Sequence, residues 1–579
     1  MGADSSVLVA ALCGAAAGAL LLLLLLRGRG RGRLRAQADE GRGRRERALE
    51  HMAEAAARFR EQSPGIDADL ILSLSLVELA KQLGDGSLSP DWVFYTYVDK
   101  ALQVTKEINC VTDYLQESES QLQQVKRQEK KGLLYGVPVS IKDSINCQGH
   151  DSTLGLWKRL NQPAAEDSLV VQVLKRQGAL PFVKTNVPQG LLTFDCNNLI
   201  FGQTLNPLDH TKTPGGSSGG EAALIGSGGS VLGIGTDLGG SLRIPAAFCG
   251  ICTLKSTGGR LSKRGMVSCI PGQKSAVAGI GPMAKDVDSL ALCMRALLCE
   301  DMFRLDPTVP PMPFNEEVFS SSRPLRIGYY STDFYIVQGP SMRRAVLETK
   351  ELLENAGHTL VPFKPCGTEY FISQLCLKTL FADEGATFLE LFTGEPKEPS
   401  MKRFLWLFKV PRPLRLLLSW ILKSIEPRLA SILRTMRERS VKELWKLHCE
   451  TEEYCREFTD KWSRLDLDVM LCPALGPAFQ IGFPGKTSVS TSYSILYNYL
   501  DFPAGVVPVT TVTEEDEEEL KNNKRYCNNL WDEAFVQAIQ GAVGLPVAVQ
   551  CVALPWQEEL CLRFMKEVET LTQKKQRNL

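Results

Sequence analysis

Two stretches of the chain are apolar enough to suggest contact with a membrane, and the first lies near the N-terminus. Residues 7–26 carry no charged side chain and end in seven consecutive leucines. Twenty helical residues at about 1.5 Å each span the hydrocarbon core of a bilayer. Five arginines follow between positions 27 and 35, whereas a cleaved secretory signal has its positive charge before the apolar region. The pattern predicts an uncleaved transmembrane anchor over residues 1–29, with the rest of the chain in the cytosol.

The second apolar stretch, residues 401–436, differs because basic residues interrupt it. Lys409, Arg412 and Arg415 lie around a proline-containing break at 411–413. Each such charge adds roughly 3 kcal/mol to the insertion of a spanning helix, and an internal proline ends or kinks a helix. The pattern predicts two short amphipathic helices that lie in the membrane interface. A buried helical hairpin with exposed arginines would give the same pattern, so both interpretations remain open here.

The remaining pattern changes from helical to strand-like along the chain. Residues 36–89 are rich in helix formers and poor in Gly and Pro, which predicts that a basic linker and a helical lead-in occupy residues 30–90. Residues 131–288 are rich in Gly and contain short apolar runs such as 137–141. Such runs are typical of buried strands that alternate with helices. The expected fold class is therefore α/β.

Composition and charge exclude several classes of protein. The 66 basic side chains balance 66 acidic ones, so the basic excess of a nucleic-acid-binding protein is absent and no nucleic-acid partner is expected. The 17 cysteines are odd in number and scattered, which favours reduced thiols over a disulfide framework. Cys249 and Cys252 have C-x-x-C spacing but no second ligand pair follows, so no metal is expected. The phosphate-binding loop motif is also absent, and no cofactor is predicted.

The densest chemical signal lies in residues 214–255, where 12 of 42 positions are glycine. Such density destabilises regular elements and is typical of backbone that approaches a ligand closely. Residues 215–219 match the G-x-S-x-G elbow of Ser-His-Asp hydrolases, but no apolar strand precedes them, as that elbow requires. Only His358 and His448 follow in the chain, and neither has a catalytic context. A histidine-based triad is therefore disfavoured.

A lysine can replace histidine as the base that activates a serine, provided that it is held neutral. Lys142 ends the apolar run 137–141. Its pKa would have to fall by about 3 units from the usual 10.4, which corresponds to roughly 4 kcal/mol of desolvation. Taken alone, this motif also fits a lysine at a strand end whose ammonium group lies in water.

Three segments together resemble the amidase signature family. They are GVPVSIKD (136–143), the tripeptide Lys184-Thr185-Asn186, and GGSSGGEAALIGSGGSVLGIGTDLGGSLRIPAAFCG (215–250). The likeness covers about residues 90–575, and the last segment is highly specific. It implies one α/β catalytic domain over residues 91–579, in which a twisted mixed sheet is surrounded by many helices and residues 401–436 form an inserted membrane-binding cap.

The resemblance also assigns roles to individual residues. It implies that Ser241 is the nucleophile, that Ser217 is a bridging hydroxyl after a cis peptide bond, and that Lys142 is the base. Backbone amides of the family's oxyanion hole correspond here to Leu238, Gly239, Gly240 and Ser241.

The anchor and the cap make the chain similar to membrane-attached members of this family that cleave fatty-acid amides. The implied activity is hydrolysis of N-acylethanolamines and primary fatty amides to a fatty acid plus amine or ammonia, with esterase activity as a side reaction. A homodimer on an endomembrane, the endoplasmic reticulum in particular, is implied. The residues expected to line the acyl channel, each of which could equally belong to the core, are Leu191, Phe194, Leu380, Phe381, Phe404, Met436 and Trp531.

Two other functions remain to be separated from this one. The first is an amidase-signature enzyme with a non-lipid substrate, such as the glutamine-hydrolysing subunit of a tRNA amidotransferase. The second is an inactive membrane scaffold. The apolar segments disfavour the former, and the presence of Lys142, Ser217 and Ser241 disfavours the latter.

Overall fold

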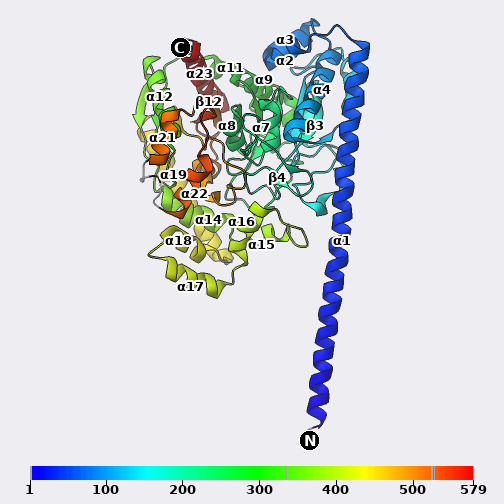
Figure 1. Cartoon of the computed structure of the whole chain (residues 1–579). Helices are drawn as coiled ribbons and strands as arrows, with labels where there is room; N and C mark the ends of the chain where they lie inside the picture. The colour runs from blue at the N-terminus through cyan, green and yellow to red at the C-terminus, as the bar shows by residue number, and fades with distance from the viewer. Residues whose placement is uncertain (1–2, 333–334, 523–525, 527–528, 578–579) are drawn as a thin grey trace.

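A large mixed sheet with helices packed around it forms the body of the protein (Figure 1). The computed structural model describes the backbone of residues 3–332, 335–522, 526 and 529–577. Side chains are described for the same residues except 3–31, 33 and 407. Within these limits eleven strands form the sheet, in the order β1-β3-β2-β6-β8-β7-β12-β13-β11-β9-β10.

Parallel pairing in the sheet is confined to β3-β2-β6 and to β11-β9-β10, and the other neighbours are antiparallel. The strands are β1 Val111–Tyr114, β2 Pro138–Lys142, β3 Leu180–Thr185, β6 Gly233–Asp237, β7 Cys252–Lys255, β8 Gly279–Ala284, β9 Arg326–Tyr329, β10 Thr359–Pro362, β11 Val469–Pro473, β12 Ala504–Thr511 and β13 Pro546–Val552. A separate two-stranded ribbon pairs β4 Asn197–Asn198 with β5 Gly202–Gln203.

Twenty-three α-helices surround this sheet in the described part of the chain. The N-terminal half contributes α1 Ala3–Gln62, α2 Ala68–Ser73, α3 Leu76–Asp85, α4 Pro90–Ile108, α5 Glu117–Val125, α6 Leu169–Arg176, α7 Gly219–Gly226, α8 Arg243–Cys249, α9 Val287–Leu297, α10 Glu300–Leu305 and α11 Glu316–Ser320. The C-terminal half contributes α12 Pro340–Asn355, α13 Thr368–Tyr370, α14 Leu377–Leu380, α15 Ala386–Glu390, α16 Pro399–Lys409, α17 Arg412–Leu422, α18 Pro427–Thr435, α19 Val441–Arg464, α20 Ser492–Tyr499, α21 Glu514–Asn522, α22 Leu530–Ile539 and α23 Glu558–Arg577.

The strands that carry the Gly-rich segments are buried on both faces. All five residues of β2 are buried, as are all five residues of β6. This agrees with the expectation of continuous apolar strands covered by helices on either side. Helix α8 follows β6 after a short loop. The loop before α7 reaches the same place, because the N–H of Ser218 donates to the carbonyl oxygen of Ser241.

Helix α1 is part of the body as well as an extension from it. Its C-terminal part packs on the body of the protein, where Met52 is fully buried. Arg45 donates from Nε to the carbonyl oxygen of Val111 at 2.8 Å, and Arg44 forms an ion pair with Asp151 at 2.5 Å. The helical pattern predicted for residues 36–89 is therefore present here, and Arg44 and Arg45 dock the helix on the body.

The N-terminal part of α1 continues beyond the body (Figure 1). The predicted anchor, residues 7–26, falls where side chains lie outside the described part, although its backbone is helical. Within the described part of the chain, no helix has the length and apolar character needed to cross a bilayer.

The segment 401–436 forms three short helices, α16 to α18, rather than the two that the sequence predicts. The break between α16 and α17 falls at Val410 and Pro411, as expected from the prolines. Trp420 is 75% exposed and Ile425 is 71% exposed. By contrast Arg415 is buried, and it pairs with Glu384. The expected basic face therefore loses one of its charges to an internal ion pair.

Candidate active site

Lys142 is the last residue of β2 and its side chain is completely buried. Its Nζ lies 2.8 Å from Ser217 Oγ, 2.9 Å from Thr236 Oγ1 and 3.3 Å from the carbonyl oxygen of Thr236. Each of these three partners is uncharged. A buried ammonium group with only neutral partners is costly, so this environment favours the neutral amine.

Burial lowers the pKa of Lys142 to about 7, although the nearby Asp237 carboxylate opposes part of this effect. The direction matches the sequence-based expectation of a lysine poised near neutrality. A substantial share of Lys142 therefore lacks its proton at neutral pH and can act as a base.

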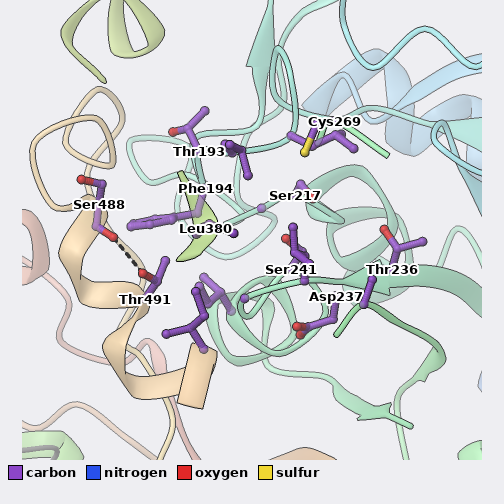
Figure 2. Close-up of a pocket in the computed structure, with 18 of the residues that line it drawn as sticks. Thr193, Phe194, Ser217, Thr236, Asp237, Ser241, Cys269, Leu380, Ser488 and Thr491 are labelled. Carbon is purple, nitrogen blue, oxygen red and sulfur yellow. Dashed lines mark hydrogen bonds between the residues drawn. The ribbon is translucent and has the colours of Figure 1, made fainter. Parts of the chain in front are cut away.

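Ser217 and Ser241 line one cavity, and the end of β6 lines it too (Figure 2). Ser217 follows a cis peptide bond from Gly216 and is almost fully buried. The loops that carry the two serines are joined directly, because the N–H of Ser218 donates to the carbonyl oxygen of Ser241 at 3.0 Å. The structure thus brings together the three residues that are predicted to pass a proton from one to the next.

A buried ion pair fixes the loop that carries Ser241. Arg243 donates to the Asp237 carboxylate from Nε at 3.0 Å and from Nη2 at 2.9 Å. Its remaining donors reach Ser494 O, Gln550 Oε1 and Asn498 Oδ1 at 2.7 to 2.8 Å. Both charges are therefore compensated, which is the condition under which a buried ion pair is tolerated.

Asp237 also holds the backbone of the same loop. Its carboxylate accepts from the N–H of Gly240 at 2.8 Å and from the N–H of Leu242 at 3.1 Å. Arg243, with smaller contributions from Lys255 and the Gly240 amide, keeps the pKa of Asp237 well below its ordinary value despite burial. The carboxylate thus stays ionised and continues to bind the loop.

The Gly240 amide is consequently unavailable to an oxyanion. Of the four residues predicted to supply oxyanion donors, the N–H of Gly240 is already bound to Asp237. Gly240 instead serves conformation: its φ is +124°, and a Cβ atom there would lie 2.3 Å from Ser494 Oγ. Candidate donors are therefore the amides of Leu238, Gly239 and Ser241, which lie on the cavity wall.

A second carboxylate fixes the strand end that carries Lys142. Asp143 accepts from the N–H of Thr153 at 3.1 Å, from its Oγ1 at 3.0 Å and from the N–H of Leu154 at 2.7 Å. Asp143 directs its charge away from Lys142 toward this turn. Asp143, the residue just after β2, thus binds the turn, while Lys142 at the strand end contacts Ser217 and Thr236.

An apolar cavity, open to the outside, extends from the serines. Five of the seven residues predicted for the acyl channel line it: Leu191, Phe194, Leu380, Phe381 and Phe404. Met436 and Trp531 do not line it but belong to the hydrophobic cluster that contains Leu191 and Phe381. Their predicted role in the channel therefore lacks direct contact with the cavity.

Sequence reasoning missed Thr236, Asp237 and Arg243 as residues that organise the site. A signal was present, since opposite charges flank the glycine pair in Asp237-Leu-Gly-Gly-Ser-Leu-Arg243, and both lie in an otherwise apolar run. Their distant partners carried no signal.

The features that the sequence discounted lie elsewhere. His448 contacts Ser275, and His358 accepts from the N–H of Leu325, so neither joins the cavity wall. Cys249 and Cys252 are buried in α8 and β7. No group of His, Cys, Asp or Glu suited to a metal ion occurs among the residues that the structure describes.

Comparison with known proteins gives a consistent result. The family model described as Amidase matches residues 93–562. A protein of Sus scrofa named fatty-acid amide hydrolase 1 is 54% identical over 526 residues, which cover 91% of this chain and 90% of that protein. A Gallus gallus protein named vitamin D3 hydroxylase-associated protein is 56% identical, with coverage of 70% of this chain and 87% of that protein.

A solved structure of a fatty acid amide hydrolase superposes with a TM-score of 0.77 at 26% sequence identity. The match covers 93% of this chain and 95% of that one. The similarity thus extends over the sheet, the site and the surrounding helices.

The burial that lowers the pKa of Lys142 and so favours its action as a base should also lower the free energy of unfolding of the protein. Since the folded-state pKa of Lys142 lies near 7 and the ordinary value near 10.5, the unfolded chain binds more protons between these pH values. Wild-type stability should then rise with pH across that window. Lys142→Met should unfold less readily at pH 7, by on the order of 2 kcal/mol, because methionine fills the space without a charge to desolvate.

Urea unfolding of both proteins at pH 7 and pH 9 measures this difference, which should narrow at the higher pH. Lys142→Ala serves as the control, since it removes the charge but leaves a cavity and should gain less. An advantage for Lys142→Met that is the same at both pH values would contradict a depressed lysine pKa.

Proposed function

The chain belongs to the amidase family, and we propose that it is a membrane-attached serine hydrolase that cleaves fatty-acid amides to a fatty acid and an amine or ammonia. The observation that carries the chemistry is the contact of a fully buried lysine with Ser217, 2.8 Å away, in the cavity that also exposes Ser241. The extensive identity to a fatty-acid amide hydrolase supports the substrate class.

In the proposed reaction Ser241 attacks the amide carbonyl while its proton moves through Ser217 to Lys142. A neutral amine has two N–H donors and one lone pair. Thr236 Oγ1 and the Thr236 carbonyl oxygen lie at distances that suit the two donors, which leaves the lone pair to accept from Ser217. The same path returns the proton to the leaving nitrogen, without which an amine departs poorly. Water then hydrolyses the acyl-enzyme.

Backbone amides supply the second contribution. Negative charge develops on the carbonyl oxygen during attack, and preorganised N–H groups stabilise it. We assign this role to the amides of Leu238, Gly239 and Ser241, because Asp237 and Arg243 hold their loop rigidly. Rigidity matters here since donors that need not reorganise contribute most.

The apolar cavity supplies the binding energy for a long acyl chain. Each methylene that leaves water contributes about 0.8 kcal/mol before ordering costs. The wall includes Phe194, Phe381 and Phe404 in addition to aliphatic side chains. We infer that the acyl chain occupies this space and that its amide lies beside Ser241.

Two segments support attachment to a membrane. Residues 7–26 have the composition of a spanning helix, and we propose that residues 1–29 anchor the catalytic domain, 91–579, on the cytosolic face of the endoplasmic reticulum. The exposed apolar side chains of α17 would add a second contact. In Figure 1 this helix and the N-terminal part of α1 lie toward the same end of the molecule. By analogy with the family we further propose a homodimer with both caps on one face.

Covalent labelling tests the nucleophile directly. A fluorophosphonate should modify the wild-type protein on the peptide that contains Ser241, and Ser241→Ala should abolish labelling because no other group is assigned to attack. Mass spectrometry locates the adduct, and Ser275→Ala provides a matched serine control that should label normally. An adduct on Ser217 would overturn the assignment.

Hydrolysis assays with oleamide and with glutamine separate the two substrate classes. They use unlabelled protein from a preparation that reacts with the fluorophosphonate. Turnover of oleamide but not of glutamine supports a lipid amide as the substrate. The reverse result would identify the amidotransferase-like alternative, and labelling without any turnover would favour a scaffold.

Loss of the base should affect amides and esters unequally. Lys142→Ala should lower kcat/KM more for a fatty amide than for the matched methyl ester, because an alcohol leaves with less protonation than an amine. Activity of this variant should also require higher pH, since hydroxide must replace the base. Rates for both substrates from about pH 6 to pH 10 bracket the ordinary and lowered lysine pKa. Equal losses with an unchanged pH profile would remove Lys142 from the proton path.

The cap should retain the protein on membranes after the anchor is removed. Deletion of residues 1–29 should leave activity and part of the membrane binding, whereas Trp420→Glu and Ile425→Glu in that background should release the protein. Flotation with lipid vesicles measures binding, and Leu70→Glu on α2, which is also exposed, is the control. Full solubility of the truncated protein without detergent or high salt would contradict a role for the cap.

A further inference from the structure

Glu221 is a buried carboxyl group that the reaction described above does not use. It is the third residue of α7, which begins shortly after Ser217. Its side chain is completely buried. Oε2 lies 2.5 Å from Ser140 Oγ, and Oε1 lies 2.8 Å from Thr185 Oγ1.

These two contacts join α7 to the strands that position Lys142. Ser140 and Lys142 are two residues apart on β2 and therefore point to the same face of the sheet. Thr185 is the strand partner of Lys142 on β3. Glu221 thus connects the helix after Ser217 to both strands beside Lys142, and it sets the distance between the bridging serine and the base.

The space for this carboxyl group is closely fitted. Gly233 on β6 pairs with Ser140, and a Cβ atom at Gly233 would lie 2.1 Å from Glu221 Oε2. Glycine at this point of the strand admits the acid. A carboxyl group held this tightly cannot turn toward water to obtain solvation.

The other ionisable groups that act on Lys142 are either compensated or neutral, so Glu221 is the carboxyl group whose charge state matters to it. Among the described groups, Asp237 also acts on Lys142, but it is bound by Arg243. The thiols of Cys196 and Cys269 are near too, and burial raises the pKa of each to about 12, so both are neutral. Lys142 is the ionisable group that acts on Glu221 in turn, and burial raises the pKa of Glu221 to about 8.

We propose that Glu221 is a positioning residue held as a neutral carboxylic acid, which ties α7 to β2 and β3 without placing a negative charge beside Lys142. This role rests on the proposed function of Lys142 as a base. An ionised Glu221 would stabilise the ammonium form of Lys142, raise its pKa and remove the base at neutral pH.

The hydrogen bonds around Glu221 accommodate the proton. Ser140 Oγ lies 2.5 Å from Glu221 Oε2, so in the proposed neutral state the acid O–H donates to Ser140. Ser140 then donates to Ser230 Oγ at 3.0 Å, and Ser230 donates to the carbonyl oxygen of Leu232 at 2.8 Å. Thr185 donates to the other oxygen of the acid. Each hydroxyl proton in this chain therefore has an acceptor, as a buried polar network requires.

Difference infrared spectroscopy tests the protonation state without reference to activity. At pH 7 the wild-type protein should show the carbonyl stretching band of a protonated carboxylic acid that is absent from Glu221→Gln. Asp195→Asn is the matched control, because it removes another buried carboxyl that lies outside this network. If the band is equally strong in the wild-type protein and in Glu221→Gln, or is missing from both, the proposal is overturned, even if Lys142 acts as the base.

Kinetics test the positioning role. Glutamine keeps the shape, the donor and the acceptor of the neutral acid. Glu221→Gln should therefore keep kcat/KM within about threefold and leave the acidic limb of the pH profile of kcat/KM at the same pH. Glu221→Ala should lose at least about tenfold while it remains folded by thermal unfolding. An acidic limb that moves one pH unit or more to lower pH in Glu221→Gln would show that a negative charge had been removed from beside Lys142. That outcome, or an unimpaired Glu221→Ala, would overturn the proposal.

Discussion

The site depends on a lysine that is buried without a carboxylate in contact with it. Lys142 has Ser217 and Thr236 as hydrogen-bonding partners, so its charged form lacks the compensation that buried cations normally have. This constraint organises the surroundings. Two aspartates near it in the chain or in space have other partners: Asp143 binds a turn, and Asp237 binds Arg243 and the loop of Ser241. Burial among neutral partners therefore lowers the pKa of Lys142 toward neutrality, which the proposed role of a base requires.

The glycine-rich sequence follows from the same close packing. Loops before α7 and α8 must bring two serines to the end of β6, and the carboxylates beneath them approach the backbone directly. At Gly240 the positive φ and the proximity of Ser494 exclude a side chain, while at Gly233 the acid of Glu221 occupies the place of one. The glycines thus make room for polar groups that fix the backbone.

Prediction from sequence succeeded where the signal was local and failed where it was not. The α/β class could be inferred from local patterns, and the prolines at 411 and 413 placed the helix break correctly. The roles of Lys142, Ser217 and Ser241 stay predictions from the family resemblance, although the structure brings these residues to one place. The partners of Arg243 could not be inferred, because Ser494, Asn498 and Gln550 lie about 250 to 310 positions away in the chain. Docking of α1 was also missed, since an arginine that binds a backbone carbonyl resembles a solvated arginine in sequence.

Helix α16 has a consequence for how the enzyme responds to its surroundings. Phe404 lines the cavity, whereas Trp406, two residues later, is largely exposed on the same short helix. Thermal motion of the outer surface and of the cavity wall is therefore shared, because a single rigid turn carries both side chains. A lipid surface or detergent that restricts the motion of α16 from outside also reduces the conformational entropy of the cavity wall. The entropy lost by that wall when a substrate binds is then smaller. The medium around the protein thus changes the free energy of substrate binding without contacting the substrate.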